Sequence, residues 1–331
     1  MESTLFHPLH GLAGADEMRE TEQNRKMSSD RLGGRTLSPR QVAQALGVSE
    51  STLKRSADRH ELHVFRTSGG HRRISYDEAL RFARQRGLPV LQPEVLGLHV
   101  APPAHAAPGN GCESLADHLS ELLMDDQLDA ARALLLNAFA GGTPIAELCD
   151  GPIRECLRRF GEYWDCNGDA GICIEHAATD LMTQALNRMR SAMQPHPDAP
   201  TPPVAVGGSP TDDPYSLPSL MASTVMTDCG YRGINLGTHT PLFALRDAVR
   251  RYRPRVVWLA SSGCGAHPDP EELEALAEAA AEAGAALLVG GRGFEAAPPR
   301  LSAPHAYLPT MVDLARAARA LRYAQAEGTG D

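Results

Sequence analysis

The sequence has no long apolar run and no regular arrangement of cysteines. It contains no stretch of 18 apolar residues, and residues 1–30 lack the apolar core of a signal peptide, so neither a membrane span nor secretion is expected. The seven cysteines are scattered without a CxxC pair, which argues against a disulfide framework or a zinc site and favours buried, reduced thiols. We therefore expect a soluble protein of the cytoplasm.

Other familiar patterns are also missing. There is no visible internal repeat and no coiled-coil heptad. No nucleophile–base pair or cluster of metal ligands has a spacing that indicates catalysis, and we expect a protein that is not an enzyme.

Basic residues are concentrated in one part of an acidic chain. The net charge is −9, yet the segment from Arg31 to Arg86 holds 12 arginines and lysines against five acids. A basic head on an acidic body is the charge distribution of a protein that binds nucleic acid through one domain.

That basic segment has the pattern of a DNA-binding unit. Residues 38–60 read as helix, glycine turn and helix, with Gly47 at the turn and Ser49 as the N-cap of the second helix. The sequence RTSGGHRR, residues 66–73, follows as a basic hairpin. The second helix is expected to enter the major groove and the hairpin to hold phosphates.

This segment, Thr36 to Gly87, resembles the winged helix-turn-helix of MerR-type transcription regulators. The resemblance rests on the helix pair SPRQVAQALGVSESTLKR, the wing RTSGGHRR and the closing helix SYDEALRFARQRG, in that order. It implies double-stranded operator DNA as the partner. The residues assigned to DNA binding are Arg40, Ser51, Lys54, Arg55, Arg59, Arg66, His71, Arg72 and Arg73.

Proline-rich stretches divide the remainder of the chain. Helical periodicity then predicts four amphipathic helices, and four short apolar runs of β type, followed by a weaker fifth, alternate with helices towards the end. The predicted parts are a disordered segment over 1–34, a winged helix-turn-helix domain over 35–87, a linker over 88–111, a four-helix bundle over 112–193, a linker over 194–203 and a flavodoxin- or Rossmann-like doubly wound parallel sheet over 204–326.

The bundle and sheet together resemble the cobalamin-binding module of methionine synthase and of cobalamin-dependent photoreceptor repressors. The resemblance covers roughly residues 112–325 and implies cobalamin, such as adenosylcobalamin, as cofactor, and homo-oligomerisation as the response. MerR regulators ordinarily dimerise through a coiled coil; without one, this chain is expected to assemble through the bundle and the α/β domain.

Three motifs carry the second resemblance. A tryptophan followed by a Glu–His pair corresponds to the family's cap over the upper face of the corrin, a serine pair ends one strand, and a Gly-Gly pair ends another. We expect the glycines to leave room for the nucleotide tail. The residues assigned to the cofactor are Trp164, Glu175, His176, Asp213, Tyr215, Ser261, Ser262, Gly290 and Gly291.

The family's cobalt-ligating histidine is missing. In its Asp/Glu-x-His-x-x-Gly motif the acid corresponds to Asp213, but Tyr215 stands for the histidine and Pro218 for the glycine. A neutral phenol is a poor cobalt ligand. Three outcomes remain open: cobalamin binds with its own base or water below the cobalt, a different histidine such as His239 or His267 ligates the metal, or the scaffold has lost the cofactor.

The leading interpretation is a DNA-binding transcriptional repressor whose C-terminal module senses a corrinoid or light, or mediates oligomerisation. One alternative is a corrinoid carrier for a methyltransferase, which would need the missing histidine and would have no use for the wing. The other is a cofactor-independent oligomeric regulator controlled by a protein partner.

Overall fold

We describe the fold from a computed structural model of the chain. The residues described are 36–88, 90–92, 95, 111–167, 169–195, 201–264 and 267–328. The predicted disordered segment over 1–34, like most of the linker over 88–111, lies outside the described residues. None of the helices in the described ranges is long and apolar enough to cross a membrane.

The N-terminal domain is a winged helix-turn-helix, as predicted. Ser38 accepts a hydrogen bond from the Gln41 amide while the Gln41 side chain accepts one from the Ser38 amide, and this capping box starts the first helix. Gly47 ends that helix at φ 64°, a conformation that favours glycine. The sheet order is β1-β3-β2. The elements are β1 (Thr36–Leu37), α2 (Pro39–Leu46), α3 (Glu50–Asp58), β2 (Phe65–Arg66), β3 (Arg72–Ser75) and α4 (Tyr76–Arg86).

The first residues of the predicted linker are not a free tether. The Leu91 and Gln92 amides both donate to the carbonyl of Ala45, at 2.8 and 3.2 Å. The Gln44 amide group donates to the Gln92 side chain. The chain therefore folds back over the end of α2 before it leaves the domain.

The middle of the chain forms the predicted helical bundle, with one irregularity. The third helix, expected from Ile153, is preceded by a short helix and a π-helical turn containing Pro152. The elements are α6 (Gly111–Met124), α7 (Leu128–Ala140), α8 (Ile145–Leu148), the π-turn Cys149–Ile153, α9 (Arg154–Asn167) and α10 (Asp169–Ala192).

The C-terminal domain is a five-stranded parallel sheet of order β5-β4-β6-β7-β8. This order reverses at β4, as it does in a flavodoxin-like doubly wound fold, and confirms the predicted fold class. The elements are β4 (Val204–Gly208), α11 (Leu217–Asp228), β5 (Arg232–Asn235), α12 (Leu242–Tyr252), β6 (Val256–Ala260), α13 (Pro270–Glu282), β7 (Ala286–Gly290), a 3-10 turn (Arg292–Phe294), β8 (His305–Leu308) and α14 (Met311–Gly328).

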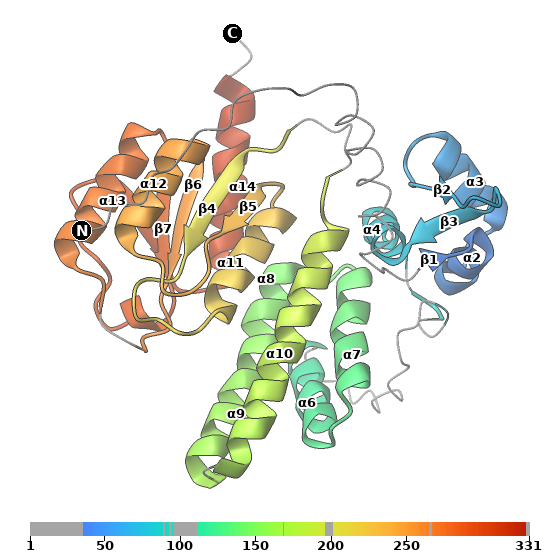
Figure 1. Cartoon of the computed structure of the whole chain (residues 1–331), viewed down its shortest axis with the longest axis horizontal. Helices are drawn as coiled ribbons and strands as arrows, with labels where there is room; N and C mark the ends of the chain where they lie inside the picture. Colours follow the sequence, from blue (N-terminus) through green and yellow to red (C-terminus); the bar gives the residue numbers. More distant parts are fainter. Residues whose placement is uncertain are drawn as a thin grey trace, which may run out of the picture.

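The two faces of this sheet have different neighbours. Helices α11 and α14 cover one face and pack against the bundle, whereas α12 and α13 cover the opposite face (Figure 1). Asp150 of the π-turn accepts hydrogen bonds from the Met311 and Val312 amides and so caps α14 from the bundle.

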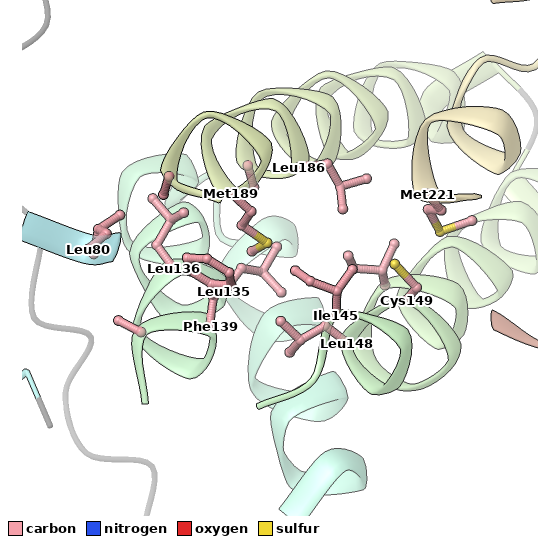
Figure 2. Close-up of a cluster of buried hydrophobic side chains, with 14 of the residues drawn as sticks. Leu80, Leu135, Leu136, Phe139, Ile145, Leu148, Cys149, Leu186, Met189 and Met221 are labelled. Atoms are coloured by element: carbon pink, nitrogen blue, oxygen red, sulfur yellow. The ribbon is translucent and has the colours of Figure 1, made fainter. Parts of the chain in front are cut away.

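One hydrophobic cluster runs through all three domains, and a second lies under α12 and α13. The first joins the interior of the winged domain to the bundle and to the α11 side of the sheet. Figure 2 shows Leu80 of α4 beside Leu136 and Phe139 of α7, with Met221 of α11 at the other end of the cluster. The DNA-binding domain is therefore packed on the body of the protein rather than only tethered to it.

Arg84 of α4 contacts both other domains. Its guanidinium donates to the carbonyls of Phe139 and Thr143 at 2.8 and 3.0 Å, and to the Asp228 carboxylate of α11 at 2.8 Å. It also lies 4.4 Å from the centre of the Phe139 ring. A second ion pair joins Arg188 of α10 to Asp77 at the start of α4, at 2.9 Å. These contacts fix the orientation of the winged domain.

The cysteines are expected to react according to their burial. Burial raises the pKa of Cys149, and that of Cys156 and Cys229 to about 11 each, whereas Cys173 and Cys264 are exposed. Because the thiolate is the reactive form, maleimide at about pH 8 should label Cys173 and Cys264 and leave the three buried thiols unmodified. Peptide mass spectrometry of the native protein tests this, with the urea-unfolded protein as control. Equal labelling of Cys149 and Cys264 in the native protein would contradict the fold.

Candidate functional site: a nucleic-acid interface and a sheet edge

Helix α3 presents a polar, basic face to solvent. Ser49 caps the helix by accepting a hydrogen bond from the Thr52 amide at 3.1 Å, and Leu53 and Ser56 face the core. The 3.6-residue period then turns Ser51, Lys54 and Arg55 outward. All three side chains are exposed, as are Arg59 at the end of the helix and Arg40 on α2.

The predicted wing is an antiparallel hairpin. Phe65 pairs with Arg73 and Arg66 with Arg72. Gly70 has φ 78°, and its amide donates to the Thr67 carbonyl at 2.8 Å, which closes the turn. His71 lies at the exposed tip, while Arg72 and Arg73 are half-buried along β3.

The cations of this domain fall into two groups. Arg81, Arg84 and Arg86, all on α4, form ion pairs with Glu78, Asp228 and Glu61. By contrast, the predicted DNA-binding cations form no ion pair with any residue in the described ranges. They are Arg40, Lys54, Arg55, Arg59, Arg66, Arg72 and Arg73. The cations of α4 thus help to hold the domain together, whereas those of α2, α3 and the wing form no ion pair with a described residue.

A cleft of about 270 Å³ lies between α3 and the wing. Leu53, Leu62 and Ile74 line it, and Lys54 and Arg72 lie along it as well. Sequence reasoning missed this cleft, and it also missed Phe65, which is 46% exposed on β2 beside the basic residues. An aromatic residue next to Arg66 in a short exposed strand was the available signal.

At the carboxyl edge of the sheet, Asp213 is almost completely buried. Its carboxylate accepts hydrogen bonds from the Ser262 amide at 2.6 Å, the Ser262 hydroxyl at 2.7 Å and the Tyr215 amide at 3.1 Å. Asp213 and Ser262 were both assigned to the cofactor site. The structure brings them together although they are 49 residues apart in the sequence. Because both carboxylate oxygens already accept hydrogen bonds from the protein, Asp213 serves to fix the loop.

Tyr215 lies where this edge faces the bundle. Partial burial raises the pKa of its phenol, and the neighbouring Cys264 and the carboxylate of Glu175 on α10 raise it further, while Arg292 opposes the shift. The structure therefore brings the predicted cap residue Glu175 near Tyr215. The phenol stays protonated at neutral pH and is no anionic metal ligand.

The glycine pair has a structural explanation that needs no cofactor. A Cβ on Gly290 would lie 2.6 Å from the Leu308 carbonyl oxygen. One on Gly291, which has φ 94°, would lie 2.2 Å from the Ser261 carbonyl oxygen. The neighbouring backbone thus leaves no room for a side chain at either glycine, and their contact with a nucleotide tail stays a prediction.

The remaining predicted residues are dispersed. His176 is exposed, with its ring 3.5 Å from Glu175. His239 has φ 49° and its amide lies 3.3 Å from the Asp213 carbonyl, while its exposed ring, like that of His267, has no ligating partner among the described residues. Trp164 belongs to α9, but its side chain lies outside the described part. No group of three or more potential metal-ligating side chains was found in the described ranges.

The interior beneath α11 is filled by Trp258 of β6. Its indole donates to the Ser219 hydroxyl at 3.1 Å, which in turn donates to Asn235 at 2.7 Å. Gly207 is required here because a Cβ would lie 2.2 Å from the Trp258 carbonyl oxygen. For a corrinoid, the described residues offer Glu175 on the bundle side and a phenol, in place of an imidazole, at residue 215.

Comparison with known proteins agrees with the N-terminal assignment. Residues 36–87 match a family model described as a helix-turn-helix domain. The chain is 27% identical over 272 residues to the HTH-type transcriptional repressor CarA of Myxococcus xanthus, covering 78% of this chain and 87% of the relative.

Similar solved structures include two corrinoid proteins. The Methanosarcina barkeri monomethylamine corrinoid protein has a TM-score of 0.46 and 11% identity, covering 62% of this chain and 98% of that one. A cobalamin-binding protein of Desulfitobacterium hafniense DCB-2 has a TM-score of 0.31 and 16% identity, covering 65% and 97%.

Proposed function

We propose that the protein is a cytoplasmic DNA-binding transcriptional repressor whose bundle and α/β domain control its self-assembly on operator DNA. The carrying observation is that the exposed cations of α3 and those of the wing form no ion pair with a described residue, whereas the α4 cations are all paired. Lys54 and Arg55 are proposed to reach the major groove, and Arg66, Arg72 and Arg73 the flanking phosphates. The similarity to a repressor over most of the chain supports the direction of regulation.

The signal proposed for the bundle and the α/β domain is a corrinoid. The specific proposal is that adenosylcobalamin binds there and that light acts on it. Support comes from the resemblance of its motifs and from Glu175, whose charge acts on the phenol of Tyr215. Bound adenosylcobalamin would supply a light-sensitive cobalt–carbon bond. Because residue 215 is a tyrosine, the protein is proposed to hold the corrinoid without a ligand to cobalt from this loop.

The visible spectrum and sedimentation of the purified protein test this proposal. After incubation with adenosylcobalamin in darkness and removal of free cofactor, we expect a retained corrinoid band and an oligomer size that changes on illumination. A protein that retards promoter DNA but retains no corrinoid would instead be a cofactor-independent regulator. A methyl carrier would retain corrinoid and leave DNA unretarded.

Tyr215→His is expected to tighten cobalamin binding at least about tenfold, because an imidazole nitrogen binds cobalt better than a neutral phenol. Tyr215 is 41% exposed, so the replacement leaves the core intact. Equilibrium dialysis against cobalamin measures the change, and Tyr215→Phe, expected to bind like the parent protein, is the control. Equal affinities for the histidine and phenylalanine variants would show that residue 215 does not face the cobalt.

A further inference from the structure

The sheet face turned away from the bundle carries two adjacent helices of opposite charge. From residue 242 to 255, α12 and the chain after it hold five arginines and one aspartate. From 269 to 282, α13 and its cap hold six acids and no arginine or lysine. The two helices pack side by side over one apolar core (Figure 1). A basic helix therefore lies next to an acidic one.

These opposite charges do not neutralise each other within the chain. Arg250 pairs with Asp247 on its own helix at 3.0 Å. Glu274 accepts hydrogen bonds from the Ser302 and Ala303 amides. Across the part of the chain that the structure describes, no ion pair joins α12 to α13. Arg251, Arg253, Glu278 and Glu282 are all exposed without one.

We propose that the outer face of α12 and α13 is a homodimer interface, in which α12 of each copy lies against α13 of the other. This inference deepens the proposed function, because it assigns the surface through which the body brings two DNA-binding heads together. The interface is the outer surface of these two helices, which lie on the side of the sheet opposite the bundle.

Symmetry allows the charges of both helices to be satisfied at once. The two-fold axis runs parallel to the helices and lies between the two copies. It places α12 over the partner's α13 and α13 over the partner's α12, which closes the dimer. Both helices follow a parallel strand and so begin at the same edge of the sheet. Arg250 is the ninth residue of α12 and Glu278 the ninth of α13, so they lie at the same level.

Charge complementarity selects a second copy over nucleic acid. A phosphate backbone drawn to α12 would also meet the carboxylates of α13, which repel it. A second copy instead places its acidic α13 against the basic α12 and its basic α12 against the acidic α13. Phe243, 55% exposed at the start of α12, adds apolar surface to this face.

Charge reversal tests the arrangement on the full-length protein by sedimentation velocity at micromolar concentration. Arg250→Glu and Glu278→Arg should each weaken dimerisation at least about tenfold. Residue 250 of each copy meets residue 278 of the other, so either change creates two contacts between like charges in the dimer. A mixture of the two variants should dimerise again, since each copy then meets its complement at both positions. Dimerisation of the parent protein should weaken in about 1 M salt.

Arg316→Glu on α14 is the matched control. Arg316 is 74% exposed and pairs with an aspartate three residues earlier, as Arg250 does, but it lies on the other face of the sheet. It should leave dimerisation unchanged. A monomeric parent protein, single variants that still dimerise, or a mixture that stays monomeric would each overturn the interface.

Gel retardation with the same preparations separates this inference from the proposed function. A parent protein that is monomeric yet retards DNA overturns the interface alone. One that dimerises as described but does not bind DNA overturns the repressor function alone.

Discussion

Replacing Arg72 and Arg73 together with alanine is expected to abolish retention of promoter DNA in a gel-retardation assay. Both residues lie on β3 of the wing, and neither forms an ion pair with a described residue that could compensate for its removal. Removing two phosphate-binding cations from each head of a dimer eliminates about four counterion-release contributions, which lowers affinity by about a hundredfold or more at physiological salt. A duplex selected by the protein from a randomised pool serves as the probe.

The control for this experiment removes the same charge elsewhere. Arg154 and Arg316 are exposed on the bundle and on α14, each near an aspartate of its own helix or turn. Arg154→Ala with Arg316→Ala should leave DNA retention within about threefold of the parent protein. Undiminished binding by the Arg72/Arg73 variant would defeat the assignment of the wing.

The second large effect is expected at Phe139. Its side chain is fully buried between α7 and α4, and its ring and carbonyl both contact Arg84. Phe139→Ala removes a large apolar group and leaves a cavity at the junction of the head and body, so the free energy of unfolding should fall by about 3–5 kcal/mol. Urea denaturation followed by circular dichroism measures the decrease.

Tyr323 provides the comparison, because it is 73% exposed on α14. Tyr323→Ala should change the free energy of unfolding by less than about 0.5 kcal/mol. Since one core runs through the three domains, the parent protein is also expected to unfold in a single transition. An early, separate transition for the winged domain, unaffected by Phe139→Ala, would show that the head is not part of that core.

Local chemistry explains why much of the architecture was predictable. Ser49 and Gly47 act at the helix ends where the sequence patterns place them, because caps depend on residues within a few positions. The apolar runs that become β4, β6 and β7 are buried on both faces, so periodicity alone indicates parallel strands.

Contacts between distant residues were not predictable. Arg84 has the same local pattern as the DNA-facing arginines, yet it binds Asp228, 144 residues away. Nothing near it in the sequence distinguishes a cation that joins domains from one that meets phosphate. The glycines at 290 and 291 show the same limit, because the backbone atoms that exclude a side chain there come from Leu308 and Ser261.

The salt dependence of DNA binding tests most directly whether the wing holds phosphate. We expect the logarithm of the affinity to fall steeply with the logarithm of the salt concentration. The Arg72→Ala/Arg73→Ala variant should have a slope that is shallower by about 0.9 for each phosphate that the wing no longer neutralises. A slope that is the same for the variant and the parent protein would show that the wing does not hold phosphate, and would contradict the proposed mode of DNA binding.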